Sequence, residues 1–268
     1  MGSSFLKWAG GKHWLVNNES HRFPTQFNKY IEPFLGGGAV FFFIAPEQSL
    51  LSDVNSELIN TYVAIKDNYE SVYSNLRRHQ SNNSKEYYYK VRESNPRTPA
   101  TCAARMIYLN KTCFNGIYRV NKAGRFNVPY GTERALNFEK EKFKSTAEAL
   151  KSADIRCQDF ETTINEAQEG DFIFCDPPYA VIDENNRFIG YNAEQFTWND
   201  QERLANCLIE AKNRGVLIMM TNVDHPLVRA LYEHDEDFVL DTIDRKCVIS
   251  GISAGRKTYK ELVVTANY

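Results

Sequence analysis

The stretch Phe172-Ile173-Phe174-Cys175-Asp176-Pro177-Pro178-Tyr179 joins an apolar run to an acidic, proline-rich turn. A short apolar run bounded by such a turn predicts a buried strand, and open α/β sheets bind ligands beyond the carboxyl ends of their strands. Two successive prolines fix φ and donate no N–H, so they make a stiff turn with available carbonyls. This turn can offer the Asp176 carboxylate and the Pro177 carbonyl to the amino group of a planar base, with Tyr179 as a stacking surface. The alternative is an ordinary strand-to-loop turn with a capping Asp.

A second motif combines a glycine-rich loop with an acidic strand end. Glu32-Pro33-Phe34-Leu35-Gly36-Gly37-Gly38 follows the short run Tyr30-Ile31, and Asp53 ends the run Leu50-Leu51-Ser52. In βαβ nucleotide sites the glycines permit close backbone approach, and the acidic residue accepts the ribose hydroxyls. The spacing differs from a dinucleotide fingerprint, and no Lys-Ser or Lys-Thr pair follows the glycines as in a P-loop. The motif therefore favours a nucleoside ligand without phosphates.

Both motifs lie where β-type runs alternate with helical patterns. This alternation, before about residue 55 and after about residue 150, predicts an α/β fold with a mostly parallel, doubly wound sheet. The expected strands are Tyr30-Ile31, Leu50-Leu51, Ile155–Cys157, Asp171–Cys175, Val216–Met220 and Leu262–Val264, and the expected helices are Gln201–Asn213 and His225–Tyr232.

Residues 56–145 differ in pattern and in charge. We expect helices near Glu57–Arg78 and Ala100–Tyr108, a polar break at Ser81–Ser84, and a β-hairpin in which Ile117–Val120 and Arg125–Val128 flank Asn121–Gly124. The segment holds 16 Lys/Arg and 8 Asp/Glu, a net charge of +8, whereas the rest of the chain carries −10. This asymmetry indicates a phosphate-contacting module, and a basic two-stranded ribbon fits the DNA major groove. The alternative is a lysine-rich solvated surface.

The composition is typical of a cytosolic globular protein. The chain has 268 residues, 43% of them apolar, and the apolar run at 39–45 is too short to span a membrane. Its six cysteines are scattered, without a C-x-x-C pair or a cluster with the five histidines, so we predict neither a metal nor a disulfide. A monomer is favoured.

Together the motifs resemble the Dam-type DNA adenine-N6 methyltransferases over nearly the whole chain. The matching segments are Lys7-Trp8-Ala9-Gly10-Gly11-Lys12, the Glu32–Gly38 loop with Asp53, the region from Tyr108-Leu109-Asn110 to Asn127-Val128-Pro129, and Asp176–Tyr179. Their order is similar to that of the α group of amino methyltransferases. The resemblance implies a Rossmann-like S-adenosylmethionine-dependent methyltransferase sheet formed by 1–55 and 146–268. It also implies an inserted, mainly helical target-recognition domain at 56–145 that carries the β-hairpin.

The reaction implied is methyl transfer from S-adenosyl-L-methionine to adenine N6 in double-stranded DNA, at GATC or a related site. This nitrogen is a poor nucleophile because its lone pair is delocalised into the ring, so the site must hold the amino group and align it. The catalytic residues implied are Asp176, Pro177, Pro178 and Tyr179. The target base lies inside a duplex and has to flip out of the stack to reach them.

The cofactor-binding residues that the resemblance implies are Trp8, Gly10, Lys12, Phe34, Gly36, Asp53, Asp159, Phe160 and Asp176. Asp53 would accept the ribose hydroxyls, while Trp8 and Lys12 would close over the methionine end. Asp159 would bond the cofactor's adenine amino group, with Phe160 against the ring. In the alternative, Phe34 and Phe160 are core residues and Asp159 is a helix N-cap.

The DNA-binding residues implied are Lys7, Phe114, Asn115, Ile117, Arg119, Arg125, Asn127 and Pro129. Lys7 maps onto a base-reading position, Arg119 would read guanine, and Ile117 and Pro129 would touch a thymine methyl group. Phe114 and Asn115 match residues that enter or flank the gap left by the flipped base, although Phe114 could instead pack within the hairpin.

Other basic residues are expected to position the DNA without reading it. We assign Arg125, Lys122 and Lys111 to phosphates. The segment Gly131-Thr132-Glu133-Arg134-Ala135-Leu136 departs from the family pattern, and Glu133 would repel a phosphate, which leaves the recognition sequence open. The basic stretch at 250–257 is either a loop near DNA or a plain surface turn.

Three other roles remain open. Methyltransferases that act on protein glutamine or on RNA adenine use a related tetrapeptide, although the N-terminal block and the hairpin argue against both. A catalytically inactive DNA-binding module is the third, and the intact Asp176–Tyr179 argues against it. The sequence does not distinguish a restriction-modification system from a phage or host regulatory setting.

Overall fold

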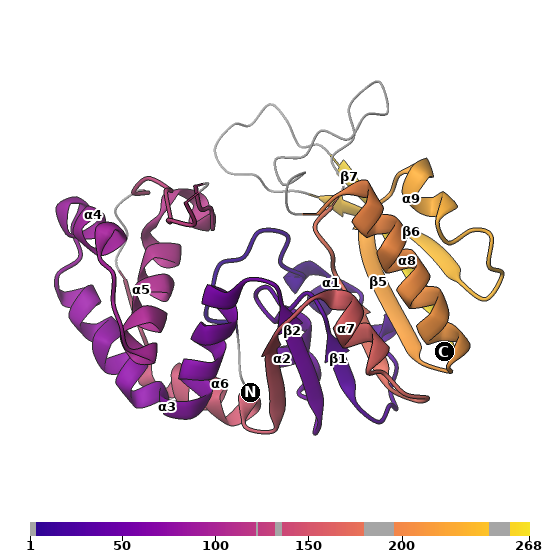
Figure 1. Cartoon of the computed structure of the whole chain (residues 1–268), viewed down its shortest axis with the longest axis horizontal. Helices are drawn as coiled ribbons and strands as arrows, with labels where there is room; N and C mark the ends of the chain where they lie inside the picture. The colour runs from indigo at the N-terminus through magenta and orange to yellow at the C-terminus, as the bar shows by residue number, and fades with distance from the viewer. Residues whose placement is uncertain (1–3, 122, 132–135, 180–195, 247–257) are drawn as a thin grey trace. The chain divides into compact units, whose positions relative to one another are not determined.

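The computed structural model describes residues 4–121, 123–131, 136–179, 196–246 and 258–268 (Figure 1). The chain divides into two compact units. The first comprises Met1–Arg22 and Leu35–Cys157, and the second comprises Phe23–Phe34 and Gln158–Tyr268. The domain boundaries expected near residues 55 and 146 stay a prediction.

The described strands form a seven-stranded sheet in the order β3-β2-β1-β4-β5-β7-β6. The strands are β1 (Tyr30–Glu32), β2 (Ser49–Asp53), β3 (Ala153–Cys157), β4 (Phe172–Cys175), β5 (Leu217–Val223), β6 (Val239–Lys246) and β7 (Thr258–Ala266). Each of the six expected strands is present, and the α/β fold class is confirmed.

The strand that precedes the acidic turn, β4, lies between β1 and β5 in the second unit. β4 pairs in parallel with β1, with Phe172 opposite Tyr30, and in parallel with β5, with Phe172 opposite Leu217. All four residues of β4 are buried, as the unbroken apolar run predicts. In the first unit, β2 pairs in parallel with β3, and Asp53 is opposite Cys157 at their carboxyl ends.

One side of the sheet departs from the expected parallel pattern. β7 runs antiparallel to both β5 and β6. Antiparallel neighbours need no crossover helix, so this end of the sheet does not follow the strand-helix alternation from which a parallel sheet was expected. The register places Thr221 of β5 opposite Val263 and Asn222 opposite Leu262.

The first unit is rich in helices. They are α1 (His13–Asn18), α2 (Ala39–Ile44), α3 (Ser56–Ser81), α4 (Lys85–Glu93), α5 (Pro99–Thr112) and α6 (Lys140–Leu150), with the 3₁₀ turns η1 (Ser20–Arg22) and η2 (Phe114–Gly116). The helices expected near Glu57–Arg78 and Ala100–Tyr108 are therefore confirmed as α3 and α5. The polar break at Ser81–Ser84 coincides with the end of α3 and the N-cap of α4.

The two longest helices of this unit, α3 and α5, begin at side-chain caps. The Asn55 side chain caps α3 by accepting a hydrogen bond from Leu58, and Thr98 with Thr101 forms a capping box at α5. α3 is broken at Asn68, whose backbone is non-helical and whose side chain accepts from the Ser71 N–H. The expected single helix is thus two segments, with α5 packed beside them (Figure 1).

The expected hairpin forms only sparse pairing in the described residues. Val120 and Phe126 make an antiparallel bridge, and the Asn127 N–H donates to the Arg119 carbonyl at 3.1 Å. The Asn121 N–H donates to the Arg125 carbonyl at 2.9 Å, next to the turn. The two arms are therefore antiparallel, but neither forms an extended strand.

The second unit contributes the helices α7 (Phe160–Asn165), α8 (Trp198–Asn213) and α9 (Pro226–Ala230). α8 confirms the expected helix at Gln201–Asn213 and starts at a Thr197/Asp200 capping box. α9 is shorter than the expected His225–Tyr232, because His225 is its N-cap and Pro226 its first residue. Among the described residues, no helix is both long and apolar enough to cross a membrane.

Candidate functional site

The acidic turn Asp176–Tyr179, here called the catalytic turn, follows β4 directly. The Thr221 hydroxyl donates a hydrogen bond of 2.9 Å to Asp176 Oδ1. Thr221 is fully buried on β5, the parallel neighbour of β4. Adjacent strand ends therefore hold the carboxylate in one orientation, as the strand-end argument requires.

A second acidic residue holds the tyrosine of the catalytic turn. The Tyr179 hydroxyl donates to Glu261 Oε2 at 3.0 Å, and Glu261 on β7 is only 3% exposed. Burial raises the pKa of Tyr179 well above its ordinary value, and the charges of Asp176 and Glu261 raise it further. The phenol therefore stays protonated as a donor to Glu261.

A buried amide network supports the prolines of the turn. Gln201 of α8 donates through Nε2 to the Pro178 carbonyl at 3.1 Å, and its Oε1 accepts from Asn222 Nδ2 at 3.0 Å. Gln201 and Asn222 are both buried. Within the described part of the chain, the carbonyl of Pro177 accepts no hydrogen bond. The turn is thus held from one side while the predicted acceptor oxygen of Pro177 keeps its capacity to accept.

The predicted cofactor-binding residues Phe34 and Phe160 of the second unit pack in a cluster of three aromatic rings beside an arginine. Phe34 stacks on Phe160 at 5.4 Å between ring centroids, and Phe196 packs against both rings. The Arg203 guanidinium lies 4.2 Å from the Phe160 ring centroid. Phe160 is buried and Phe34 half-buried, so both rings have the packing role that was the alternative. Their contact with a cofactor stays a prediction.

Asp159 also has the alternative role that the sequence allowed. Its side chain caps α7 by accepting from the Glu161 N–H at 2.9 Å. Arg203 binds both of its oxygens, at 2.8 and 3.0 Å. A carboxylate has about four acceptor positions, so a further donor can still be accommodated. A bond from Asp159 to an adenine amino group therefore remains compatible with this geometry.

In the first unit, the glycine loop and Asp53 are joined directly. The Gly36 N–H donates to Asp53 Oδ2 at 3.1 Å, and the Asn55 N–H donates to Oδ1 at 2.9 Å. Burial raises the pKa of Asp53, against the lowering effect of the backbone bonds from Asn55, Gly36 and Val54. Among the described residues, the Gly36 and Asn55 N–H groups are the two donors within 3.1 Å of the carboxylate, which leaves acceptor capacity for hydroxyl groups. Asp53 therefore fits the pair of ribose hydroxyls predicted for it.

Trp8 packs against the same loop. A Cβ on Gly36, which has φ +46°, would lie 2.8 Å from Trp8 Cδ1. Trp8 also stacks on Tyr118, with 5.5 Å between the ring centroids. Lys12 is buried and donates to the Gly10 carbonyl at 2.9 Å. The glycine is thus required at least for the close approach of Trp8, a packing reason that the sequence pattern did not reveal.

Seven of the eight residues predicted to bind DNA are exposed side chains of the first unit. Phe114 is 52% exposed and Ile117 39%, and Lys7, Asn115, Arg119, Arg125 and Pro129 are also exposed. The alternative, in which Phe114 packs within the hairpin, does not hold, because the ring is exposed. Arg119 Nε donates to Asn127 Oδ1 at 2.8 Å, so the half-buried Asn127 orients the guanidinium.

Of the residues assigned to phosphates, Lys111 has a distinctive environment. Burial, and then the charges of Lys142 and Lys7, lower the pKa of Lys111 to about 8. An anion at this position would relieve that repulsion. Lys122, Glu133 and the basic stretch at 250–257 lie outside the described residues.

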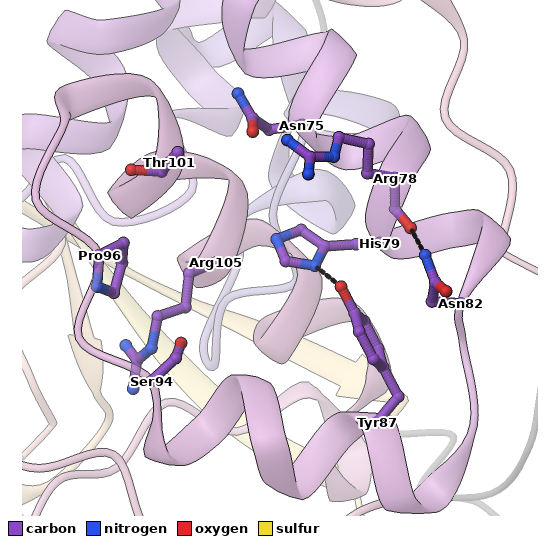
Figure 2. A pocket seen from close by; sticks show the side chains of 9 residues that line it. All are labelled: Asn75, Arg78, His79, Asn82, Tyr87, Ser94, Pro96, Thr101 and Arg105. Carbon is purple, nitrogen blue, oxygen red and sulfur yellow. Dashed lines mark hydrogen bonds between the residues drawn. The ribbon is translucent and has the colours of Figure 1, made fainter.

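A cavity of about 390 Å³ lies elsewhere in the first unit, among α3, α4 and α5 (Figure 2). Its lining includes Arg105, which donates to Glu57 and to two backbone carbonyls. It also includes His79, whose ring bonds the Tyr87 hydroxyl at 2.9 Å (Figure 2). Asn75 and Asn82 bond carbonyls of α3 itself. Because these polar groups already form hydrogen bonds among α3, α4 and α5, we assign the cavity no ligand.

Sequence reasoning missed the residues that orient the predicted ones. Thr221 and Gln201 approach the catalytic turn from 45 and 23 residues away, and Glu261 from 82. One signal was available for Thr221, which follows the apolar run Val216–Met220 at a strand end. Among the residues the structure describes, no group of three or more His, Cys, Asp or Glu could hold a metal ion.

Comparison with known proteins identifies the family. The D12 class N6 adenine-specific DNA methyltransferase family matches residues 8–246. A Type II methyltransferase of Lactococcus lactis subsp. cremoris is 39% identical over 98% of this chain and 95% of its own length. A DNA adenine methylase of Vibrio cholerae is 34% identical over 97% of this chain and 94% of its own.

A phage protein matches over a smaller share of its length. The DNA N-6-adenine-methyltransferase of Escherichia phage P1 is 36% identical over 90% of this chain, which corresponds to 32% of the phage protein. The matched region of the family includes the glycine loop, the basic module and the catalytic turn. The chain belongs to the D12 class of N6 adenine-specific DNA methyltransferases.

Proposed function

We propose that this protein transfers a methyl group from S-adenosylmethionine to adenine N6 in double-stranded DNA, and that the catalytic turn Asp176–Tyr179 performs the transfer. The observation that carries the proposal is the fixed Asp176 carboxylate at the end of β4, held by the buried Thr221 hydroxyl. A fixed acceptor aligns the weakly nucleophilic amino group without reorganising during the reaction.

The residues of the turn have separate tasks. Asp176 and the Pro177 carbonyl accept the two N–H bonds of the amino group, which favours a pyramidal nitrogen with its lone pair directed outward. Tyr179 stacks on the extruded base, and its hydroxyl bond to Glu261 fixes the ring. Pro178 stiffens the turn, and Gln201 anchors its carbonyl. No covalent enzyme intermediate is needed.

The cofactor residues follow from the same proposal. When bound, S-adenosylmethionine supplies an electrophilic sulfonium methyl group. Asp53 accepts the ribose hydroxyls in addition to its two backbone donors. The other proposed cofactor-binding residues are Trp8, Gly10, Lys12, Phe34, Gly36, Asp159, Phe160 and Asp176.

The DNA is bound and read by residues of the segment 56–145 together with Lys7. The net charge of +8 in this segment supports contact with phosphates. Arg119 reads guanine, Ile117 and Pro129 contact a thymine methyl, and the adenine flips out of the stack. GATC or a related site is the proposed target, in duplex DNA of the bacterial cytoplasm.

Transfer of a labelled methyl group to three acceptors tests this function. We expect label from S-adenosylmethionine on duplex DNA, and nucleoside digestion should place it on adenine N6. Single-stranded RNA and a protein with an exposed glutamine should stay unlabelled under the same conditions. Label on RNA or on glutamine in preference to DNA would contradict the proposal, whereas sequencing of the methylated DNA gives the recognition site.

A further inference from the structure

A buried amide connects two DNA-reading segments that are far apart in the sequence. Asn110 of α5 is fully buried. Its Oδ1 accepts the Lys7 backbone N–H at 2.7 Å, and its Nδ2 donates to the Lys7 carbonyl at 2.7 Å and to the Gly116 carbonyl at 3.1 Å. Lys7 precedes Asn110 by 103 residues, and Gly116 follows it by six.

Only a primary amide of this length can make the pattern. One oxygen must accept while one nitrogen donates twice, which is the inventory of Asn or Gln. Aspartate would direct a second oxygen at the carbonyls of Lys7 and Gly116, and leucine would leave three buried backbone groups without a partner. Glutamine is one methylene too long for a packed interior. The bonds therefore specify Asn at this position.

The segment that Asn110 holds is a tight turn, Phe114–Ile117, here called the reading turn. Its central residues Asn115 and Gly116 have φ of +55° and +67°, and the Ile117 N–H donates to the Phe114 carbonyl at 3.3 Å. Left-handed backbone at both central positions, with the sequence Asn-Gly, is the signature of a type I′ turn. The Phe114 N–H also donates to the Pro129 carbonyl at 2.9 Å, which ties the reading turn to another predicted base-reading position.

Lys7 packs directly on this turn. A Cβ at Gly116 would lie 2.8 Å from both Cβ and Cδ of Lys7, so the glycine lets the lysine stem lie against the backbone. Above this buried junction, the side chains of Lys7, Phe114, Asn115 and Ile117 are exposed. Lys7 and the reading turn therefore form one surface over a shared hydrogen-bonded base.

We propose that Asn110 is a positioning residue for sequence recognition, which fixes Lys7 and the reading turn as one rigid DNA-reading unit. The inference rests on the proposed function, because it assumes that these exposed side chains contact the target site. Rigid presentation matters for discrimination, since a base-edge contact requires both partners at hydrogen-bond distance. Binding through phosphates tolerates a displaced side chain far better.

The test compares Asn110→Asp with Thr112→Val in the full-length enzyme. Thr112 is also buried on α5, but its hydroxyl donates to the Tyr108 carbonyl of the same helix. The kcat/KM is measured on duplexes holding the methylated site found by product sequencing, and on duplexes with single base-pair changes. Binding of S-adenosylmethionine and thermal unfolding are measured on the same preparations.

We expect Asn110→Asp to reduce kcat/KM on the intact site about tenfold or more, and to change it little on altered sites. Discrimination, the ratio of kcat/KM on the intact site to that on an altered site, should therefore fall. Discrimination should partly recover as the pH is lowered, because burial and two facing carbonyls favour a protonated Asp that regains one donor. Thr112→Val should keep wild-type discrimination. Gly116→Ala, which pushes the turn away from Lys7, should reproduce the loss without altering the amide.

An equal loss on all duplexes, or retained discrimination in both Asn110→Asp and Gly116→Ala, would overturn the proposal. Loss of folding in both variants would also overturn it, because the role would then be structural. Lys7→Ala is measured in parallel to separate this inference from the proposed function. If Lys7→Ala leaves discrimination intact, the assignment of Lys7 to DNA reading fails, whatever Asn110 does.

Discussion

At the scale of single residues, the candidate site consists of predicted side chains held by unpredicted ones. Asp176 and Tyr179 follow from the local pattern of an apolar run and a proline turn. Their partners Thr221 and Glu261 come from strands that lie 45 and 82 residues away in the sequence. The apolar run before Thr221 places it near a strand end, but a single sequence does not show that either residue bonds the catalytic turn. The position of the turn after a buried strand was therefore predictable from the sequence, and the side chains that orient it were not.

The hydroxyl of Thr221 provides a test at this scale. Thr221→Val removes the donor to Asp176 with little change in shape, and a hydrogen bond to a charged group contributes about 1.5–3 kcal/mol. We expect kcat to fall on the order of tenfold or more with DNA affinity unchanged, whereas Thr221→Ser, which keeps the hydroxyl, should stay near wild type. Steady-state kinetics and DNA binding measure both. Equal activity of the Val and Ser variants would remove the orienting role.

At the scale of elements, the predictable parts were those with a strong apolar pattern. The buried runs of β4 and β5 and the periodicity of α3, α5 and α8 were sufficient to locate them. α4, α6 and β6 were missed because they are rich in charged or aromatic polar residues, as in Lys85-Glu86-Tyr87-Tyr88-Tyr89. Tertiary packing stabilises them rather than an apolar run, and only α4 has in addition a side-chain cap, from Ser84. β6, an edge strand with four charged residues among eight, shows the same limit.

The hairpin arms contain a matched pair of arginines that separates reading from positioning. Arg119, oriented by Asn127, is expected to specify a base, so Arg119→Ala should lower the ratio of kcat/KM between intact and altered sites. Arg125→Ala should instead weaken binding to every sequence and reduce the salt-dependence slope by about one. Binding titrations at several salt concentrations distinguish the two effects. A uniform loss in Arg119→Ala would make it a phosphate contact.

The helical elements around His79 predict a dependence of stability on pH. Burial, and then the charge of Arg78, lower the pKa of His79 to about 4, below its unfolded value of about 6.5. The unfolded state therefore binds more protons between these values, and stability falls as the pH decreases through this window. After allowance for partial exposure, we expect His79 to contribute about 1 kcal/mol to the loss between about pH 7 and about pH 5.

Urea unfolding at the two pH values measures that loss. His79→Gln has no titrating ring, so the pH dependence of its unfolding free energy should be smaller than that of the wild type. His21→Gln is the control, because His21 is exposed near Glu19 and packs in no such module. The same pH dependence in the wild type and in His79→Gln would show that other groups cause the loss.

At the scale of the whole molecule, the order of motifs along the chain predicted the family, and the comparisons confirmed it. The α/β class followed from the alternation of strands and helices, whereas the antiparallel placement of β7 depends on pairing that periodicity does not specify. The charge asymmetry identified a basic segment, but its recognition sequence depends on contacts with DNA. The recognition sequence can therefore be determined only with DNA present.

The most direct test of whether the catalytic turn performs the methyl transfer is the activity of Asp176→Ala, measured together with its DNA binding. We expect this variant to transfer no detectable label to duplex DNA and to bind the duplex with an affinity within about threefold of wild type, since the proposed role of Asp176 is to align the amino group. Full methyl transfer by Asp176→Ala would contradict this role, because the catalytic turn would then not perform the reaction.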